Sequence, residues 1–194
     1  VQPDATIRVV MDKLSGDNIS CNGLGNLQAN YYNKGAFNMF GVYNITKGVY
    51  KMSMQEVIRK DFILQNGGAV NFNGDPYSAQ LDMKAVYVVN SASLRDLSPT
   101  ATFSQNSTTR VNCIMNMAGT LLKPQITFGL ELPNVSEEDK DMVKSLVSTE
   151  EQMNMQIIYL LGVGRFYGGE YAQDSGNQTN QAMNSILTST LSGQ

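Results

Sequence analysis

The residues of this chain that could form a catalytic pair are its aspartates Asp61, Asp75, Asp82 and Asp96. Two carboxylates held about 5 to 9 Å apart can hydrolyse a glycosidic bond, one of them acting as the acid. Asp75, however, lies in a Gly-Asp-Pro sequence typical of a turn, and Asp82 alternates with apolar neighbours as on the polar face of a strand. We therefore interpret these aspartates as solvated, structural residues.

Histidine is absent from the sequence. This absence removes the usual general base near neutral pH, the Ser-His and Cys-His nucleophile pairs and the commonest metal ligand. GVGRFYG, at residues 162–168, has only loose phosphate-loop spacing, and it follows a predicted helix rather than a strand, so we interpret it as a helix end. We expect no catalytic residues, no metal and no cofactor.

Composition excludes further classes of protein. The net charge is -3, and the basic residues are scattered, which argues against a nucleic-acid partner. The apolar run IIYLLGVG, at 157–164, is far shorter than a membrane span, so no transmembrane segment is expected. Cys21 and Cys113 are widely separated in sequence, and either a disulfide or two buried thiols is compatible with that spacing.

The elements that carry these residues are predicted to be mainly strands. Apolar and polar residues alternate from the start to about residue 132, and Gly-rich turns separate the alternating runs, as in the stretch 59–87. Short turns between consecutive strands predict antiparallel pairing, because parallel neighbours need long crossover connections. We therefore expect a mainly β fold with an elongated antiparallel sheet.

Helices are predicted where the composition changes at Pro133. Ser136, and then Ser148 or Thr149, each precede acidic residues and an apolar stripe, which indicates two short helices near residues 136–161. We expect one domain over 1–194, with a β-rich part at 1–132, a helical part at 133–167 and a polar tail at 168–194. The sequence starts and stops without terminal signals, so we interpret it as a fragment of a longer protein.

Methionine and aromatic residues are concentrated on the apolar strand faces, and the chain has 11 methionines. One interpretation is a filled barrel or sandwich core. The other is an open groove, because flexible, polarizable methionines adapt to ligands of variable shape such as acyl chains.

An ordered set of segments resembles a known family. The segments are GAFNMFGVYNITKGVYKM, RKDFILQNGGAVNFNGDPYSAQLDMKAVY, SLRDL, AGTLLKPQITFGLELP and YLLGVGRFY. Together they resemble the C-terminal domain of TamB, the AsmA-like subunit of the translocation and assembly module. The resemblance extends from about residue 17 to the end of the chain.

The resemblance implies a curved, taco-like sheet with an apolar interior and no catalytic residues. It implies a parent protein that is anchored in the inner membrane of a Gram-negative envelope and crosses the periplasm. The implied partners are phospholipid acyl chains and an outer-membrane barrel of the TamA type. Family members continue beyond the point where this chain stops, so a segment that engages the barrel is expected to be missing.

On this basis the alternating residues are predicted to line a lipid groove between the two membranes. The predicted lining residues are Phe37, Met39, Tyr43, Phe62, Leu64, Val70, Phe72, Leu81, Met83, Ala85, Tyr87, Cys113, Met115, Met117, Ile126, Phe128 and Leu130. The alternative is a chaperone or scaffold for outer-membrane and autotransporter proteins, to which a client strand is added at a sheet edge.

Overall fold

The computed structural model of the chain describes residues 6–11, 15–31, 35, 37–54, 58–103 and 108–168. Its strands are β1 (Thr6–Val10), β2 (Asn18–Tyr31), β3 (Phe37–Met54), β4 (Ile58–Leu64), β5 (Ala69–Gly74), β6 (Gln80–Ser93), β7 (Thr108–Gly119) and β8 (Pro124–Glu131). Its helices are η1 (Pro76–Ser78), η2 (Leu94–Asp96), α1 (Glu137–Leu146) and α2 (Glu150–Val163). The predicted polar tail, beyond residue 168, lies outside the described residues.

The described strands form one sheet in the order β1-β2-β3-β4-β6-β7-β8, with β5 paired to both β3 and β6. The registers of β1 through β6 are antiparallel. β3 is long enough to pair with β5 through its first half and with β4 through its second half. The predicted mainly β, antiparallel fold with two short α-helices is confirmed for the part of the chain that the structure describes.

A bulge in β3 changes which residues point into the core. The register moves from Gly23↔Ile45 to Asn22↔Lys47, which leaves Thr46 as the extra residue. Because side chains alternate along a strand, one extra residue reverses the phase of the alternation. Ile45 is therefore buried at an odd position before the bulge, whereas Tyr50 is buried at an even position after it.

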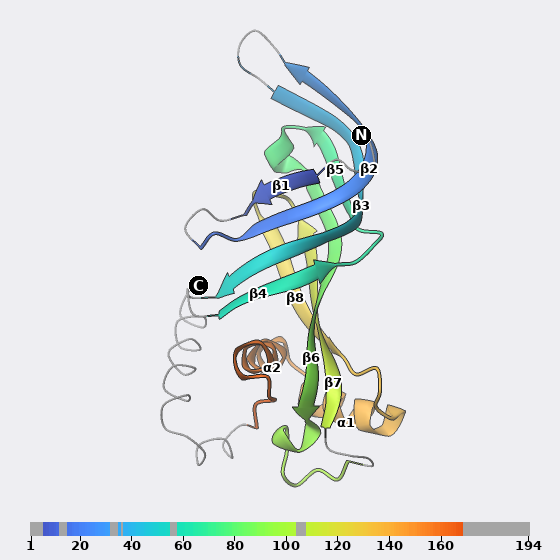
Figure 1. Cartoon of the computed structure of the whole chain (residues 1–194), viewed down its shortest axis with the longest axis vertical. Coiled ribbons are helices and arrows are strands. Elements are labelled where there is room, and N and C mark those ends of the chain that lie inside the picture. The colour runs from blue at the N-terminus through green and yellow to red at the C-terminus, as the bar shows by residue number, and fades with distance from the viewer. Residues whose placement is uncertain are drawn as a thin grey trace. The chain divides into compact units, whose positions relative to one another are not determined.

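The chain divides into two compact units. Unit 1 comprises Val1–Tyr87 and Ile114–Thr127, and unit 2 comprises Val88–Cys113 and Phe128–Gln194. In unit 1, β2 and β3 form a long, curved hairpin (Figure 1). The buried apolar face of this hairpin continues onto β4, β5 and β6, which pair with β3 and with one another. The core of this unit is a sheet face covered by its own side chains.

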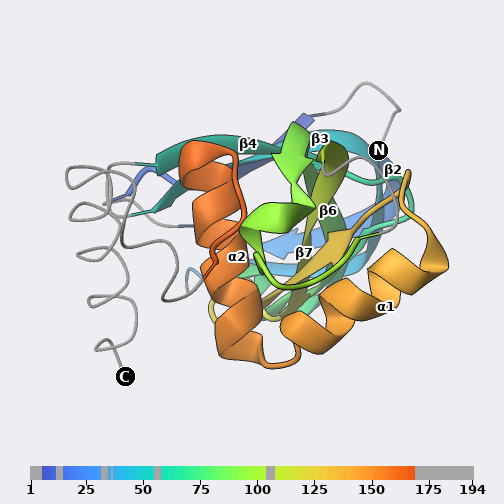
Figure 2. The same ribbon diagram turned by 90° about the horizontal axis from the view of Figure 1, so that it is seen from below.

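Unit 2 is organised around its helices, which follow one another at an angle (Figure 2). Ser136 Oγ accepts a hydrogen bond from the Asp139 amide at 3.2 Å and caps α1. Thr149 and Gln152 form a capping box at the start of α2. Both predicted helix starts are thus confirmed, with Thr149 rather than Ser148 as the second cap.

Helix α2 is buried more completely than its sequence pattern predicts. The expected apolar stripe includes Ile157 and Leu160, but Ile158 and Tyr159 are buried as well. Burial therefore extends around the whole circumference of the helix over this stretch. A helix that is apolar on every side belongs to a core rather than to a surface, so α2 is the central element of unit 2.

Candidate functional site

The aspartates considered for catalysis have structural environments. Asp75 accepts the Tyr77 amide at 3.0 Å and caps η1, and Asp96 accepts Arg165 Nε at 3.0 Å. Asp61 and Asp82 are exposed on strands. Within the described residues, three or more His, Cys, Asp or Glu side chains nowhere gather in a way that could hold a metal ion.

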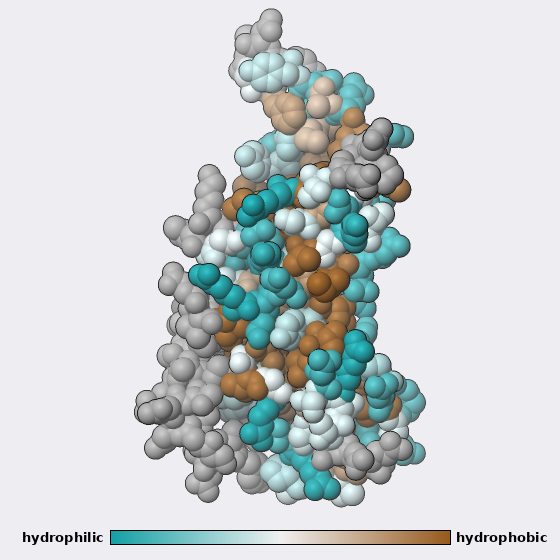
Figure 3. All heavy atoms as spheres, in the orientation of Figure 1, coloured by the Kyte–Doolittle hydropathy of each residue, from teal (hydrophilic) through white to brown (hydrophobic). Residues whose placement is uncertain are grey.

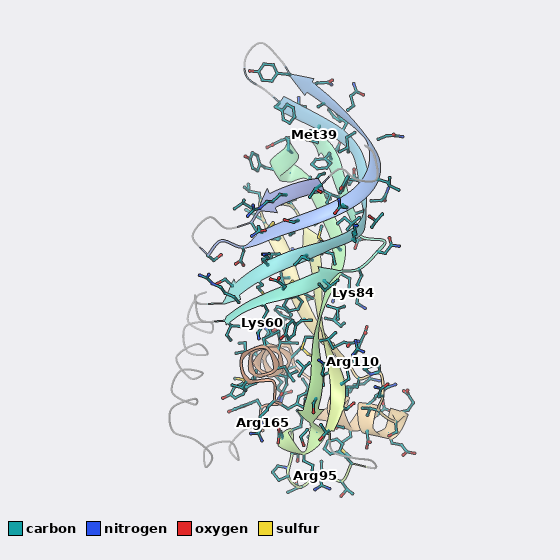
Figure 4. All side chains as sticks on the ribbon, viewed as in Figure 1. Met39, Lys60, Lys84, Arg95, Arg110 and Arg165 are labelled. Carbon is teal, nitrogen blue, oxygen red and sulfur yellow. The ribbon has the colours of Figure 1, made fainter. Side chains whose placement is uncertain are left out.

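The GVGRFYG segment ends α2. Gly164, with φ 71°, adopts the left-handed backbone conformation that ends the helix. The Gln156 amide then donates to the Tyr167 carbonyl and accepts from the Tyr167 N–H, both at 2.8 Å. Arg165, labelled in Figure 4, forms an ion pair with Asp96. Phe166 is buried in unit 2. This geometry confirms that the segment is a helix end.

The sheet register of unit 1 places many of the predicted groove residues side by side. Val70 is opposite both Tyr43 and Leu81, and Leu64 is opposite Ala85. Opposite residues in antiparallel strands share a face. The predicted residues that are buried in unit 1 are Tyr43, Phe62, Leu64, Val70, Phe72, Leu81, Met83, Ala85, Met115 and Met117.

The other predicted residues differ from this group. Met39, Tyr87 and Ile126 are only half-buried, and Phe37 is 46% exposed. Cys113, Phe128 and Leu130 belong to unit 2, where Cys113 is buried and Phe128 and Leu130 are half-buried. The structure therefore assembles the unit 1 residues on a shared face, and it assigns the last three to the other unit.

Burial of this face decreases along the β2–β3 hairpin. We call the face that carries Tyr43 the inner face. On it, Tyr43 is 0% exposed, Met39 is half-buried, and Phe37 and Tyr31 reach 46% and 75%. Figure 4 shows Met39 on the distal part of β3. The inner face is thus closed at the base of the hairpin and accessible towards its end.

The predicted lining leaves out several residues that share the buried side of unit 1, namely Ile19, Cys21, Ile45, Tyr50, Met52 and Ile58. The alternation that includes Tyr43 also includes Ile45, so that residue could have been found. Tyr50 and Met52 follow the bulge, so the face of the sheet on which they lie cannot be predicted without knowing the position of the bulge.

A cation lies beside the aromatic pair on this face. Phe62 and Tyr87 have ring centroids 5.8 Å apart, and Lys60 Nζ lies 5.3 Å from the Tyr87 ring centroid. Lys60 is opposite the buried Met52 in the register, so it belongs to the same face (Figure 4). The ring quadrupole attracts the ammonium group, and a charged side chain is thereby accommodated next to apolar ones.

Both cysteines are free, buried thiols. Burial raises the pKa of Cys21 to about 11 and the pKa of Cys113 to about 12. Burial also raises the pKa of Tyr43, whose hydroxyl donates to the Cys21 carbonyl at 3.4 Å. Thiols with raised pKa values are neutral and poorly reactive near neutral pH, so these cysteines act as small apolar core residues.

Unit 2 contains a separate apolar hollow of about 400 Å³. Its wall is formed by the end of β8 and the residues after it, by α1 and by the start of α2. The lining residues are Leu130, Glu131, Leu132, Pro133, Lys140, Val143, Lys144, Val147 and Met153. The volume lies within the range of ligand-binding cavities. Of the predicted groove residues, Leu130 is the one that lines it.

In the part of the chain that the structure describes, no helix has the length and apolar character needed to span a bilayer. The geometry defines a class of protein module: an antiparallel β-sheet with one largely apolar face, whose exposure increases along a long hairpin.

Comparison with known families narrows this class. A model of the TamB C-terminal domain matches residues 1–194, and the chain belongs to this family. The resemblance carried by the five sequence segments is therefore confirmed. The TamB family is a non-enzymatic transport and assembly family, partnered with TamA in the translocation and assembly module of the cell envelope. A search of curated proteins finds no match.

Proposed function

We propose that this module shields phospholipid acyl chains as they cross the periplasm between the inner and outer membranes. In this proposal the parent protein is anchored in the inner membrane and works with a TamA-type outer-membrane barrel. The observation that carries the proposal is the inner face of unit 1, which is largely apolar and becomes accessible from Tyr43 to Phe37.

The energetic argument concerns hydrocarbon in water. Exposing a lipid tail costs about 0.8 kcal/mol per methylene, so a tail of about 15 methylenes faces a barrier on the order of 12 kcal/mol. Contact with an apolar protein face lowers that barrier and requires no chemical step. A sheet suits this task because every second residue of each strand contributes to the face.

The two accessible apolar regions have different roles in the proposal. Met39 and Phe37 offer the open part of the unit 1 face, where a tail can bind without displacing core side chains. The hollow in unit 2 offers room for a segment of an acyl chain, which would contact Leu130 and Met153. Tightly buried residues such as Met115, 0% exposed, belong to the packed core and offer no accessible surface to an acyl chain.

Native mass spectrometry and lipid extraction of the purified chain test this proposal. We expect co-purified phospholipid, and we expect Met39→Glu to reduce its amount because a carboxylate would enter the accessible apolar face. Asn38→Glu is the matched control, since Asn38 is adjacent, also half-buried and on the opposite face. If the unsubstituted chain carries no phospholipid, or if Met39→Glu retains as much as Asn38→Glu, the proposal is wrong.

The second candidate function is assembly of outer-membrane proteins by strand addition. It is favoured by the sheet order, in which β1 and β8 are the end strands among the described residues. End strands offer backbone donors and acceptors to a client strand. Under this function, the purified chain would be free of lipid and would bind β-strand peptides from outer-membrane proteins.

A further inference from the structure

The distal part of the β2–β3 hairpin exposes large apolar side chains on both of its faces. We define this distal part as residues 24–31 and 37–44. Tyr31 and Phe37 are paired on the inner face, where they are 75% and 46% exposed. Leu24, Phe40 and Val42 lie on the outer face with exposures of 43%, 38% and 41%. Figure 3 shows hydrophobic surface among hydrophilic groups on this part of the molecule.

The charge of the hairpin is unlike that of the whole chain. The chain contains 17 acidic residues and has a net charge of -3. The sequence from Asn18 to Gln55, however, contains no aspartate or glutamate, while it contains Lys34, Lys47 and Lys51. The hairpin sequence is therefore free of carboxylates and carries three lysines, of which Lys47 and Lys51 lie towards its base and Lys51 is opposite Asp61 of β4.

The base of the hairpin is tightly packed. Tyr43 is fully buried, and its ring packs over Gly23, where an added Cβ would lie 2.8 Å from two ring carbons and in collision with the Asn44 carbonyl oxygen. The Thr46 hydroxyl donates to the Asn22 carbonyl at 3.1 Å across the bulge. The distal part extends from this packed base, and its residues 39–44 also pair with β5, so it is a sheet segment with two exposed faces.

We propose that the distal part of this hairpin inserts into the interfacial zone of a phospholipid bilayer. A protein partner would cover one face of the ribbon, whereas a bilayer interface surrounds both faces. Tyrosine and phenylalanine suit that zone because their rings tolerate a boundary between apolar and polar surroundings. The absence of carboxylates and the presence of lysines match an anionic lipid surface, which attracts basic segments.

Tryptophan fluorescence can report insertion directly, because the chain contains no tryptophan. Phe40→Trp places a reporter on the hairpin, and Ile63→Trp places one at a 52% exposed position of β4 as the matched control. With vesicles of phosphatidylethanolamine and phosphatidylglycerol, we expect a blue shift and quenching by brominated acyl chains for Phe40→Trp alone. Equal responses from both reporters, or no response from Phe40→Trp, would overturn the proposal.

Vesicle flotation tests both faces of the ribbon. We expect Phe37→Asp and Phe40→Asp each to lower the vesicle affinity about ten-fold or more, since each removes an aromatic ring that insertion would bury in the lipid and adds a charge repelled by the lipid. Ile63→Asp is the control and should leave the affinity unchanged. Thermal unfolding of each variant verifies that the fold is retained, which the exposure of the three positions favours.

The outcomes separate the possible occupants. Loss of flotation for only one of the two aspartate variants would indicate a one-sided contact and overturn bilayer insertion. Binding that is no stronger with phosphatidylglycerol than with phosphatidylcholine alone would contradict the part assigned to the lysines. Since the proposal concerns a membrane surface and not the shielding of single tails, its failure leaves the lipid content measured by native mass spectrometry unaffected.

Discussion

The two units of this chain build their cores by different means. In unit 1 the core is one face of a sheet, and residues such as Tyr43 and Phe62 alternate with solvated neighbours. In unit 2 the core surrounds α2, where consecutive residues from Gln156 to Leu161 are all buried. A sheet face built from every second residue can therefore extend beyond the buried core and remain exposed to solvent. A helix that is buried on all sides leaves no apolar face exposed.

The largest expected effect tests the core of unit 1. Phe62→Ala should lower the free energy of unfolding by about 3 to 5 kcal/mol, because it removes a fully buried ring and leaves a cavity. Ile63→Ala, at the adjacent exposed position, should change it by no more than about 0.5 kcal/mol. Urea unfolding followed by circular dichroism measures both values, and similar losses for the two variants would contradict the one-sided face.

The second largest expected effect concerns the hydrogen bonds between Gln156 of α2 and the backbone that follows this helix. Gln156→Ala should cost about 1 to 3 kcal/mol, since the buried amide makes both hydrogen bonds to the Tyr167 backbone and these groups would lose their partners. Hydrogen exchange should show faster exchange at the Tyr167 amide. Asn154→Ala, on the same helix and half-buried, is the control. An unchanged exchange rate at the Tyr167 amide would contradict a stabilising role for these two hydrogen bonds.

The smallest effect concerns the start of the same helix. Thr149→Ala removes the hydroxyl that accepts the Gln152 amide at 3.2 Å, and it should lower stability by about 1 kcal/mol. The measurement is again urea unfolding, with Thr149→Ser as a control that keeps the hydroxyl. If Thr149→Ser loses as much stability as Thr149→Ala, the cap contributes little and packing of α2 accounts for its position.

Much of unit 1 could be predicted from sequence because alternation is a local signal. The shared face of Val70, Phe72, Leu81 and Met83 follows from the period of two, and the register confirms their neighbourhood. The bulge at Thr46 could not be predicted, because it depends on how β2 and β3 pair and not on either strand alone.

The extent of burial was also beyond the sequence pattern. Phe37 and Tyr43 have the same period and similar apolar character, yet one is 46% exposed and the other 0%. Their difference arises from tertiary packing, since Tyr43 lies over Gly23 and beside Val70. For the same reason, the apolar stripe predicted for α2 did not reveal that Ile158 and Tyr159 are buried as well. The hollow beside α1 also depends on tertiary packing and could not be predicted from sequence.

The most direct test of acyl-chain shielding is site-specific photocrosslinking of the chain within its parent protein in a Gram-negative cell envelope. A photoreactive amino acid at Met39 should form crosslinks to phospholipid acyl chains, identified by mass spectrometry after extraction. The same amino acid at Ile63, which is 52% exposed on β4 and lies outside the distal part of the hairpin, should form few. Equal lipid crosslinking at both positions, or crosslinking of Met39 to protein alone, would contradict the account.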